Sequence, residues 1–503
     1  MPPSSSAPRR PAASRPLSRR SLLAASAAVP AVLAASTVPA LADPVVLGGS
    51  TSTQDVPLAT ADQRAVDGAV IRVLPRTPAT MVGLTWDASE AGSAQVAARV
   101  RGRGEDGRFG AWVDLEIAID PETGDEAPGT EVAWLGPVTE LEIRAEFDGA
   151  DATAAMTAHV LTTSAGGADG SLRADARSAM TRSGGGTATT LAASSPETPL
   201  LMAAPAIVRR ATWGADESLC RETTGHDLLR SIVVHHTAGT NMYTRSQSPQ
   251  ILRGILEYHT RTLGWADIGY NVLIDKYGRI FEGRAGGLHR VVEGAHARGY
   301  NTSTAGISLL GDFSSAAVPA AAISAIAKVA GWKLGGSFVT SATSSTTVRV
   351  TADGVVHPKG TIISLPRIFG HRDVNYTDCP GDRLYAQLDA IRRGAQEAMS
   401  SGWMVHRDAY YAAGGAPKLG MVFQIAHWED GYWVTRLTKG LVLSQGDAAG
   451  TGYATPFARE WTPAWGRPTG SAVTQATGRI TQAFAAGTAS RPSATGAVTF
   501  TRT

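Results

Sequence analysis

The apolar run Ile232-Val233-Val234 leads directly into His235-His236-Thr237-Ala238-Gly239. Three consecutive aliphatic residues that end at a turn predict a short buried strand. Successive side chains of a strand point to opposite faces, so only one of the two histidines can reach a shared metal. The pair alone is ambiguous, because one core histidine and one surface histidine would give the same pattern.

Strand and helix signals alternate around this run, from residue 205 to 398. Ser248-Pro249 predicts a helix with Ser as the N-cap and Pro at the first helical position. Further strands are predicted at 270–275, 280–281 and 304–310, and helices at 319–333 and 382–399. A Ser/Thr-bearing stretch between Gly311 and Gly370 is interpreted as a lid or a solvated loop. The fold class is therefore mixed α/β, with a central β-sheet and flanking helices.

A second candidate cluster lies near the end of this region. A predicted strand ends at His371, and Cys379 follows eight positions later. Eight extended residues span roughly 26 Å, so the loop must double back if both side chains contact one ion. Imidazole and thiolate are the ligands that zinc prefers, and three protein ligands leave a fourth position for water. A Cys220 to Cys379 disulfide is the alternative, and the residues alone leave both interpretations open.

Six motifs in this region occur in the order of a known family. They are Ile232 to Gly239, Gly264-Trp265-Ala266-Asp267-Ile268-Gly269-Tyr270-Asn271, Ile280-Phe281-Glu282-Gly283-Arg284, Gly294-Ala295-His296-Ala297-Arg298-Gly299-Tyr300-Asn301, Gly306-Ile307-Ser308, and Gly370-His371-Arg372-Asp373 through Thr377-Asp378-Cys379-Pro380-Gly381. Together they closely resemble peptidoglycan recognition proteins and zinc N-acetylmuramoyl-L-alanine amidases. The opening Arg209-Arg210-Ala211-Thr212-Trp213-Gly214-Ala215 matches as well.

The resemblance implies a site and a reaction. The Zn²⁺ ligands would be His235, His371 and Cys379, with His236 as a structural neighbour. Tyr270 and Thr377 match catalytic positions, and their hydroxyls could stabilise an oxyanion or orient water. Zinc would activate water to attack the amide between the lactyl group of muramic acid and L-alanine. His296, Arg298 and Asn301 are candidate residues of the groove that binds the stem peptide.

Three function classes are weighed against one another. The resemblance favours a zinc amidase that hydrolyses peptidoglycan, because all three ligand positions are intact. The alternative is a non-catalytic peptidoglycan-binding protein whose zinc is structural or absent. A serine hydrolase is disfavoured, since the sequence after Ser308 lacks the glycine of a nucleophile elbow.

The N-terminal 42 residues predict export. A basic start, an alanine-rich apolar run from Leu22 to Val38 and small residues at Ala40 and Ala42 have the layout of a signal peptide. Arg19-Arg20 resembles a twin-arginine signal. Without this segment the chain has 41 basic and 44 acidic residues, so nucleic-acid binding is not expected. We expect an exported protein, extracellular or associated with the cell wall, without a transmembrane anchor.

Two further regions flank the α/β domain. Residues 43–163 alternate apolar and polar side chains in short runs, which predicts an all-β, sandwich-like domain that serves as a spacer or a binding module. Residues 164–204 are rich in Gly, Ala, Ser and Thr and predict a flexible linker that lets the flanking domains move independently. Residues 401–503 form a tryptophan-rich, β-rich region with two degenerate repeats that resemble wall-associated LGFP repeats, and they are expected to bind a cell-wall polymer.

Overall fold

The computed structural model describes residues 49–60, 69–87, 89, 95–119, 126–166, 204–221, 225, 228–400, 404–445 and 449–503. The predicted signal peptide and nearly all of the predicted linker lie outside the described residues. Among the helices that are described, none combines the length and the apolar character needed to cross a bilayer.

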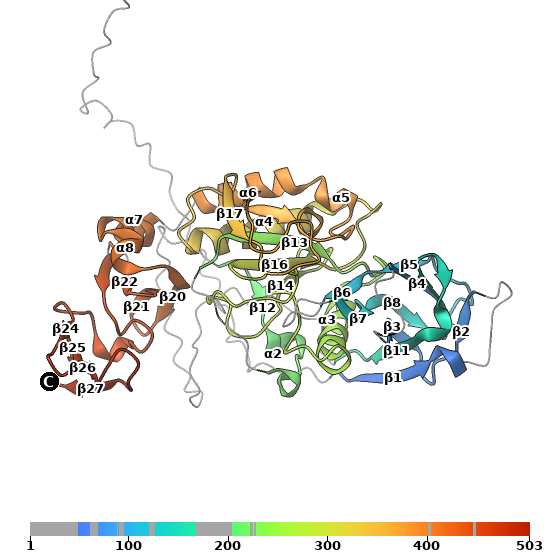
Figure 1. Cartoon of the computed structure of the whole chain (residues 1–503), viewed down its shortest axis with the longest axis horizontal. Helices are drawn as coiled ribbons and strands as arrows, with labels where there is room; N and C mark the ends of the chain where they lie inside the picture. The colour runs from blue at the N-terminus through green and yellow to red at the C-terminus, as the bar shows by residue number, and fades with distance from the viewer. Residues whose placement is uncertain are drawn as a thin grey trace, which may run out of the picture. The chain divides into compact units, whose positions relative to one another are not determined.

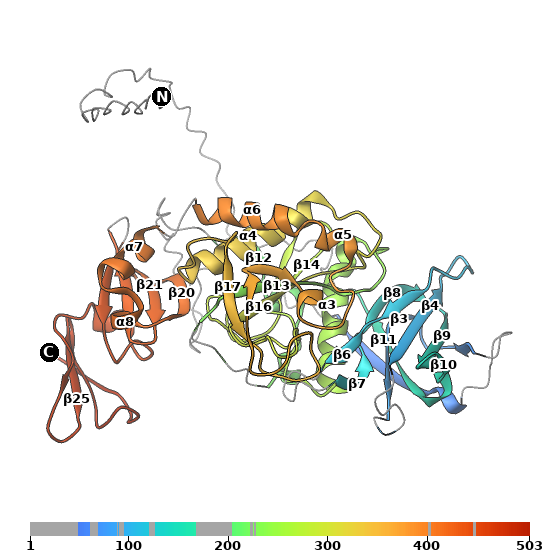
Figure 2. The same ribbon diagram turned by 45° about the horizontal axis from the view of Figure 1, so that its top comes forward.

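The N-terminal region is all-β, as predicted. One sheet contains β1 (Thr51–Pro57), β11 (Met156–Thr163), β3 (Ala79–Trp86), β7 (Glu126–Thr130), β6 (Ile117–Ile119) and β8 (Ala133–Val138). The other contains β10 (Ala150–Asp151), β9 (Glu140–Phe147), β4 (Val96–Arg103), β5 (Val113–Leu115) and β2 (Ile71–Val73). Inward side chains of both sheets, such as Val82, Val100 and Ile143, form one apolar cluster. Strands β3, β4, β8, β9 and β11 of this domain are labelled in Figure 2.

The predicted α/β domain is built on a mixed sheet. Its described strands follow the order β12 (Ile207–Val208), β15 (Ile280–Glu282), β14 (Val272–Ile274), β16 (Thr304–Leu309), β13 (Ser231–His236) and β19 (Ile368–Gly370). The pairing of β14 with β15 is antiparallel, and the other pairings are parallel. The strand predicted from the run at 232–234 is therefore β13, between β16 and β19.

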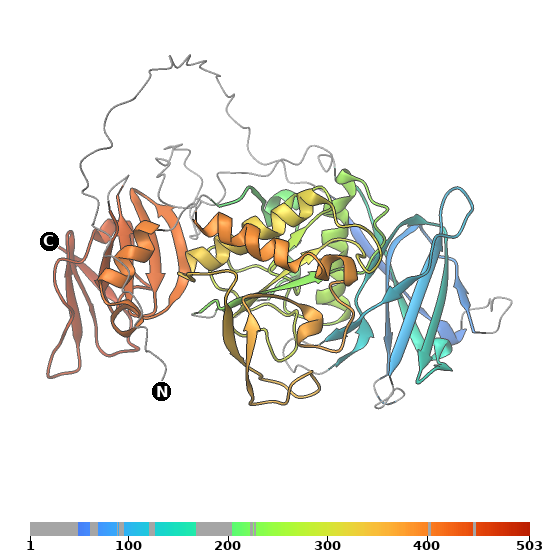
Figure 3. The same ribbon diagram turned by 90° about the horizontal axis from the view of Figure 1, so that it is seen from above.

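Helices cover both faces of this sheet. On one face, α4 (Ala320–Gly336) and α6 (Leu388–Ser400) lie side by side and pack on Ile232 and Val234 (Figures 1 and 3). On the other face, α2 (Arg210–Trp213) and α3 (Ser248–Glu257) pack on Leu273 and Phe281. Because strand side chains alternate, His235 lies on the face away from α4 and α6.

Three local expectations need correction. Helix α3 begins at Ser248 rather than after it, because Thr244 and Gln247 form a capping box on the 3-10 turn that precedes it. The predicted helix 382–399 is two helices, α5 (Asp382–Tyr385) and α6. The stretch expected to be a lid or a solvated loop contains the hairpin of β17 (Ser345–Arg349) and β18 (Ile362–Pro366), whose Val348 and Leu365 are buried.

The C-terminal region contains helices α7 (Met404–Ala412) and α8 (Gly415–Leu419) and two four-stranded sheets. The sheets are β20 (Val422–Glu429), β21 (Tyr432–Leu437), β22 (Gly440–Ser444) and β23 (Thr451–Ala454), and β24 (Val473–Thr474), β25 (Ile480–Phe484), β26 (Gly487–Arg491) and β27 (Thr499–Arg502). Val434 and Leu441 of the first sheet share a cluster with Phe484 and Ala489 of the second. The two sheets therefore bury a common core.

The β-rich N-terminal domain and the α/β domain do not behave as separate bodies. Met81, Trp134 and Leu161 of the former belong to one buried cluster with Ile251 and Phe281 of the latter. The expectation that the linker lets these two domains move independently is therefore wrong, because separating them would expose this cluster to water.

Candidate metal centre

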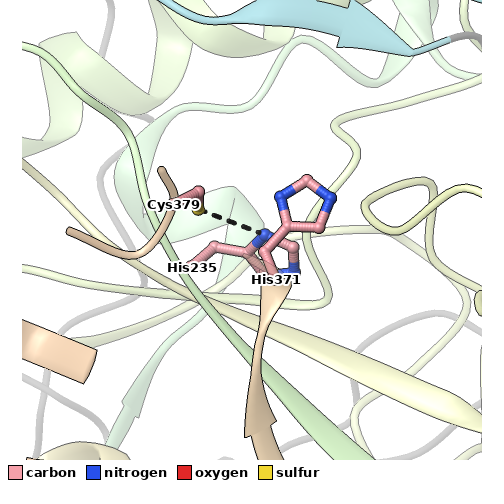
Figure 4. Close-up of side chains that lie close together, drawn as sticks. All are labelled: His235, His371 and Cys379. Carbon is pink, nitrogen blue, oxygen red and sulfur yellow. Dashed lines mark hydrogen bonds between the residues drawn. The ribbon is translucent and has the colours of Figure 1, made fainter. Parts of the chain in front are cut away.

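Three predicted ligands meet at the ends of two neighbouring strands. His235 is the second-last residue of β13, His371 follows β19, and Cys379 lies on the loop after His371. Their candidate ligand atoms all lie within 4.8 Å of one another. The Cys379 Sγ is 3.7 Å from Nδ1 of His235. Figure 4 shows the three side chains approaching one another.

The loop between His371 and Cys379 doubles back, as its length required. The Arg372 N–H donates to the Cys379 carbonyl at 2.9 Å, which closes the loop on itself. The N–H of Cys379 donates to Thr377 Oγ1 at 3.1 Å, and the N–H of Asn375 donates to the His371 carbonyl. These local bonds bring the thiol back to the strand ends despite the eight-residue separation.

The electrostatics of the trio favour neutral imidazoles. Burial and the neighbouring imidazoles hold the pKa of His235 well below its usual range. Burial lowers the pKa of His371 to about 3, with a smaller contribution from His236. Burial raises the pKa of the Cys379 thiol above its usual range, and the carboxylate of Glu116 adds to this. The dominant cause is desolvation, which penalises the charged form in each case.

The donor set fits a zinc ion. Both ring nitrogens of His371 are buried without a hydrogen-bond partner within the described structure, and buried polar atoms are rarely left unpaired. Two neutral imidazoles and a sulfur suit Zn²⁺ and are a poor set for Mg²⁺ or Ca²⁺. Neither cysteine is in a disulfide: the Cys220 thiol contacts Arg210 and Asp267 instead. The disulfide alternative is therefore wrong.

A second trio, formed by Glu116, His236 and Cys379, has the same spacing but different chemistry. The Phe313 N–H donates to His236 Nδ1 at 3.2 Å, and His236 Nε2 lies 2.8 Å from Glu116 Oε1. Both nitrogens of His236 are thus engaged in hydrogen bonds, whereas those of His371 are free. The geometry favours the trio that contains His235.

Two predicted residues lie against the ring of His235. Tyr270 is buried, with ring centroids 5.3 Å apart, and burial holds the pKa of its hydroxyl well above the usual range. His296 Nδ1 lies 3.0 Å from His235 Nε2. The pKa of His296 is lowered to about 3 by burial and by His371. Tyr270 thus keeps its proton as a hydrogen-bond donor, and His296 supports a metal-site histidine.

Of the other predicted residues, Asn301 and Thr377 make local hydrogen bonds and Arg298 lines a cavity. The carbonyl oxygen of the Asn301 side chain accepts from the N–H groups of His296 and Ala297, so Asn301 holds the turn. The Thr377 hydroxyl oxygen caps the loop at Cys379. Arg298 lines a cavity of about 770 Å³ together with Tyr270, His296, His371 and Thr377. A cavity of this size suits a ligand of drug size or larger.

The sequence did not predict which residues form the opposite wall of this cavity. The wall belongs to the N-terminal domain and includes Asp114, Glu116 and Ile117. No motif marks these residues, since they lie in an alternating strand pattern that looks like any solvated β-edge. These residues lie beside the cavity because the two domains pack together, and local sequence patterns do not predict how domains pack.

Comparison with known proteins identifies relatives of the α/β domain. The family model described as N-acetylmuramoyl-L-alanine amidase matches residues 225–382. Peptidoglycan-recognition protein SC2 of Drosophila simulans is 34% identical over 182 residues, which cover 36% of this chain and 84% of that protein. The chain belongs to the N-acetylmuramoyl-L-alanine amidase and peptidoglycan-recognition family. Peptidoglycan recognition protein 1 of Bos indicus is 32% identical over 180 residues, covering 36% of this chain and 80% of that protein.

Two further similarities are to a solved structure and to a family model of the N-terminal domain. The solved structure of Drosophila PGRP-LB is 25% identical and covers 37% of this chain and 92% of that one, with a TM-score of 0.29. A model described as Rv3811 N-terminal galactose-binding domain-like matches residues 39–165, the all-β domain. The amidase-family match covers residues 225–382 of the α/β domain and leaves the wall residues Asp114 and Glu116 outside it.

Proposed function

We propose that this protein is an exported, zinc-dependent N-acetylmuramoyl-L-alanine amidase that hydrolyses the amide bond between the muramic acid lactyl group and L-alanine of peptidoglycan. The observation that carries the proposal is the convergence of His235, His371 and Cys379, with both ring nitrogens of His371 unpartnered. Zinc bound there would supply Lewis acidity and an activated water near neutral pH. Family members that only recognise peptidoglycan do not need such a donor set.

The chain's own residues provide the remaining chemistry. His371 and Tyr270 both line the cavity, so a substrate amide bound there would lie next to these two side chains. The Tyr270 hydroxyl keeps its proton at neutral pH, so it can donate a hydrogen bond to an oxygen that gains negative charge. The Thr377 hydroxyl accepts the Cys379 N–H and keeps its own proton to donate. Tyr270 is buried, which limits competing water around its hydroxyl.

The partner is peptidoglycan, contacted through both its muramic acid and its stem peptide. Arg298 on the cavity wall is our candidate for a carboxylate of the stem peptide, and His296 and Asn301, which line the same cavity, are proposed to contact the peptide as well. The C-terminal repeats are proposed to hold the enzyme on a cell-wall polymer, and a twin-arginine signal to export it. The alternative is a non-catalytic peptidoglycan-binding protein whose zinc is structural or absent.

The test compares His371→Ala with His357→Ala in the full-length chain. His357 is a partly exposed histidine of the same domain that lies outside the metal trio, so its loss is a matched control. We expect zinc-loaded wild type and His357→Ala to release new amino termini from purified peptidoglycan, and His371→Ala or chelator-treated protein to release none. Undiminished binding with no release by the wild type would replace the amidase with the binding protein.

A further inference from the structure

The N-terminal domain contributes two carboxylates that bond to buried histidines of the amidase domain. Glu116 Oε1 lies 2.8 Å from His236 Nε2, and Glu131 Oε2 lies 2.9 Å from His259 Nε2. All but a few per cent of each histidine is buried. The same type of hydrogen bond, from a histidine Nε2 to a glutamate carboxylate, thus occurs twice at the interface between these two domains.

The protonation of both histidines follows from their second nitrogens. The Phe313 N–H donates to Nδ1 of His236, and the Gly269 N–H donates to Nδ1 of His259 at 3.1 Å. A backbone N–H can only donate, so each Nδ1 accepts and each Nε2 carries the proton that is donated to the carboxylate. Hydrogen bonds to an ionised acceptor are roughly twice as strong as neutral ones.

The interface that holds these carboxylates is closely packed. A Cβ at Gly83 would lie 2.3 Å from the Tyr258 ring, and one at Gly239 would lie 2.7 Å from the backbone nitrogen of Trp134. The Thr240 N–H also donates to the Trp134 carbonyl at 2.8 Å. Both glycines permit a close approach between the two domains that a larger residue would prevent.

Glu116 reaches the metal centre through His236. The backbone N–H of His236 donates to Cys379 Sγ at 3.4 Å, and a Glu116 oxygen lies within 4.8 Å of the same sulfur. Fixing the His236 ring therefore fixes the strand end that contacts the thiol. Glu131 lines the same cavity, but its partner His259 belongs to neither candidate trio.

We propose that the N-terminal domain is part of the catalytic unit and that Glu116 is a positioning residue, which holds His236 and thereby the Cys379 thiol in the arrangement that binds the metal. This inference rests on the metal site of the proposed function. It assigns a role to a domain that lies outside the amidase-family match at residues 225–382. Partners that orient metal ligands typically contribute 10-fold to 100-fold to metal affinity or activity.

The experiment titrates metal-free, full-length protein with Co²⁺ and records the thiolate-to-cobalt absorption band. We expect Glu116→Gln to weaken cobalt binding by about 10-fold and to change the band. Glu131→Gln is the matched control, since it removes the same charge and the same type of bond from the same interface. It should leave the cobalt affinity within about 2-fold of wild type, and thermal unfolding checks that both variants are folded. If Glu116→Gln does not fold, Glu116→Asp replaces it, because it keeps the charge and withdraws the carboxylate by one methylene.

Two results would overturn the inference. One is wild-type cobalt affinity in a folded Glu116 variant, and the other is equal weakening by Glu116→Gln and Glu131→Gln, which would indicate domain docking alone. The titration does not depend on turnover. If cobalt binding depends on Glu116 but the wild type cleaves no peptidoglycan, the inference is supported and the proposed function is contradicted. If the wild type cleaves peptidoglycan but the Glu116 variant binds cobalt as the wild type does, the proposed function is supported and the inference is contradicted.

Discussion

His296 Nδ1 lies 3.0 Å from Nε2 of His235, and two glycines make room for the His296 ring. A Cβ at Gly306 would lie 2.5 Å from ring carbons of His296, and one at Gly294 would lie 2.4 Å from Cδ2. His296 thus packs against the metal-site residue His235. The space for the His296 ring exists because strand β16 carries glycine at position 306.

Gly306→Ala should therefore weaken the metal centre. The added methyl displaces the His296 ring and removes the partner that orients His235, and small misplacements at a site of this kind cost up to about 100-fold in rate. We expect at least a 10-fold loss of kcat/KM on peptidoglycan and weaker zinc binding by competition with a chelator. Gly470→Ala is the control, since a Cβ there meets nothing within 4 Å. Unchanged zinc affinity in Gly306→Ala would contradict the supporting role of His296.

Both cysteines should be free thiols with low reactivity in the folded, metal-free protein. Burial raises the pKa of Cys220 to about 12, and Asp267 contributes to this. The thiolate is the reactive form, so alkylation of Cys220 at pH 8 should be far slower than that of an exposed cysteine. Mass spectrometry after alkylation in denaturant without reductant should show two modified thiols. A mass that is two hydrogens lower and resists alkylation would reveal the disulfide that the structure excludes.

The buried amine of Lys333 should make stability depend on alkaline pH. Burial lowers its pKa to about 8, and Nζ donates to the carbonyls of Leu288 and Arg290. An unfolded lysine titrates near 10.4, so between about pH 8 and 10 the unfolded chain binds a proton that the folded chain does not, and stability rises with pH. Relative to Lys333→Met, the wild type should gain up to about 3 kcal/mol of unfolding free energy from pH 7 to 10 in denaturant titrations. A constant difference between the two proteins across this range would refute the shift.

The C-terminal region should stabilise the amidase domain directly. Ile425 of β20 is buried in the cluster that includes α4 and α6, and its N–H donates to the carbonyl of His289. Ile425→Ala should lower the unfolding free energy of the α/β domain by about 2–5 kcal/mol, as expected for a large-to-small change in a core. Val473→Ala, at a position that is 59% exposed in the last sheet, should have little effect. If Ile425→Ala left the unfolding of the α/β domain unaltered, the shared core would be irrelevant to its stability.

The sequence predicted most of the α/β domain because its signals are local. The aliphatic run at 232–234 and the glycine and proline turns marked strand ends, and strand ends carry His235 and His371. Helix α3 begins one residue earlier than predicted, because the 3-10 turn capped by Thr244 and Gln247 leads directly into it. No sequence pattern indicated Glu116, since its contact with His236 spans 120 positions and depends on how two domains pack.

The most direct test of the central claim identifies the bond that is cut. Full-length, zinc-loaded protein is incubated with purified peptidoglycan, and the soluble products are analysed by mass spectrometry and by labelling of amino termini. Our account predicts intact peptides that begin with L-alanine together with glycan strands that keep the lactyl group, and neither product after chelation. Products cut within the glycan or within the peptide, or the same products with the metal removed, would contradict it.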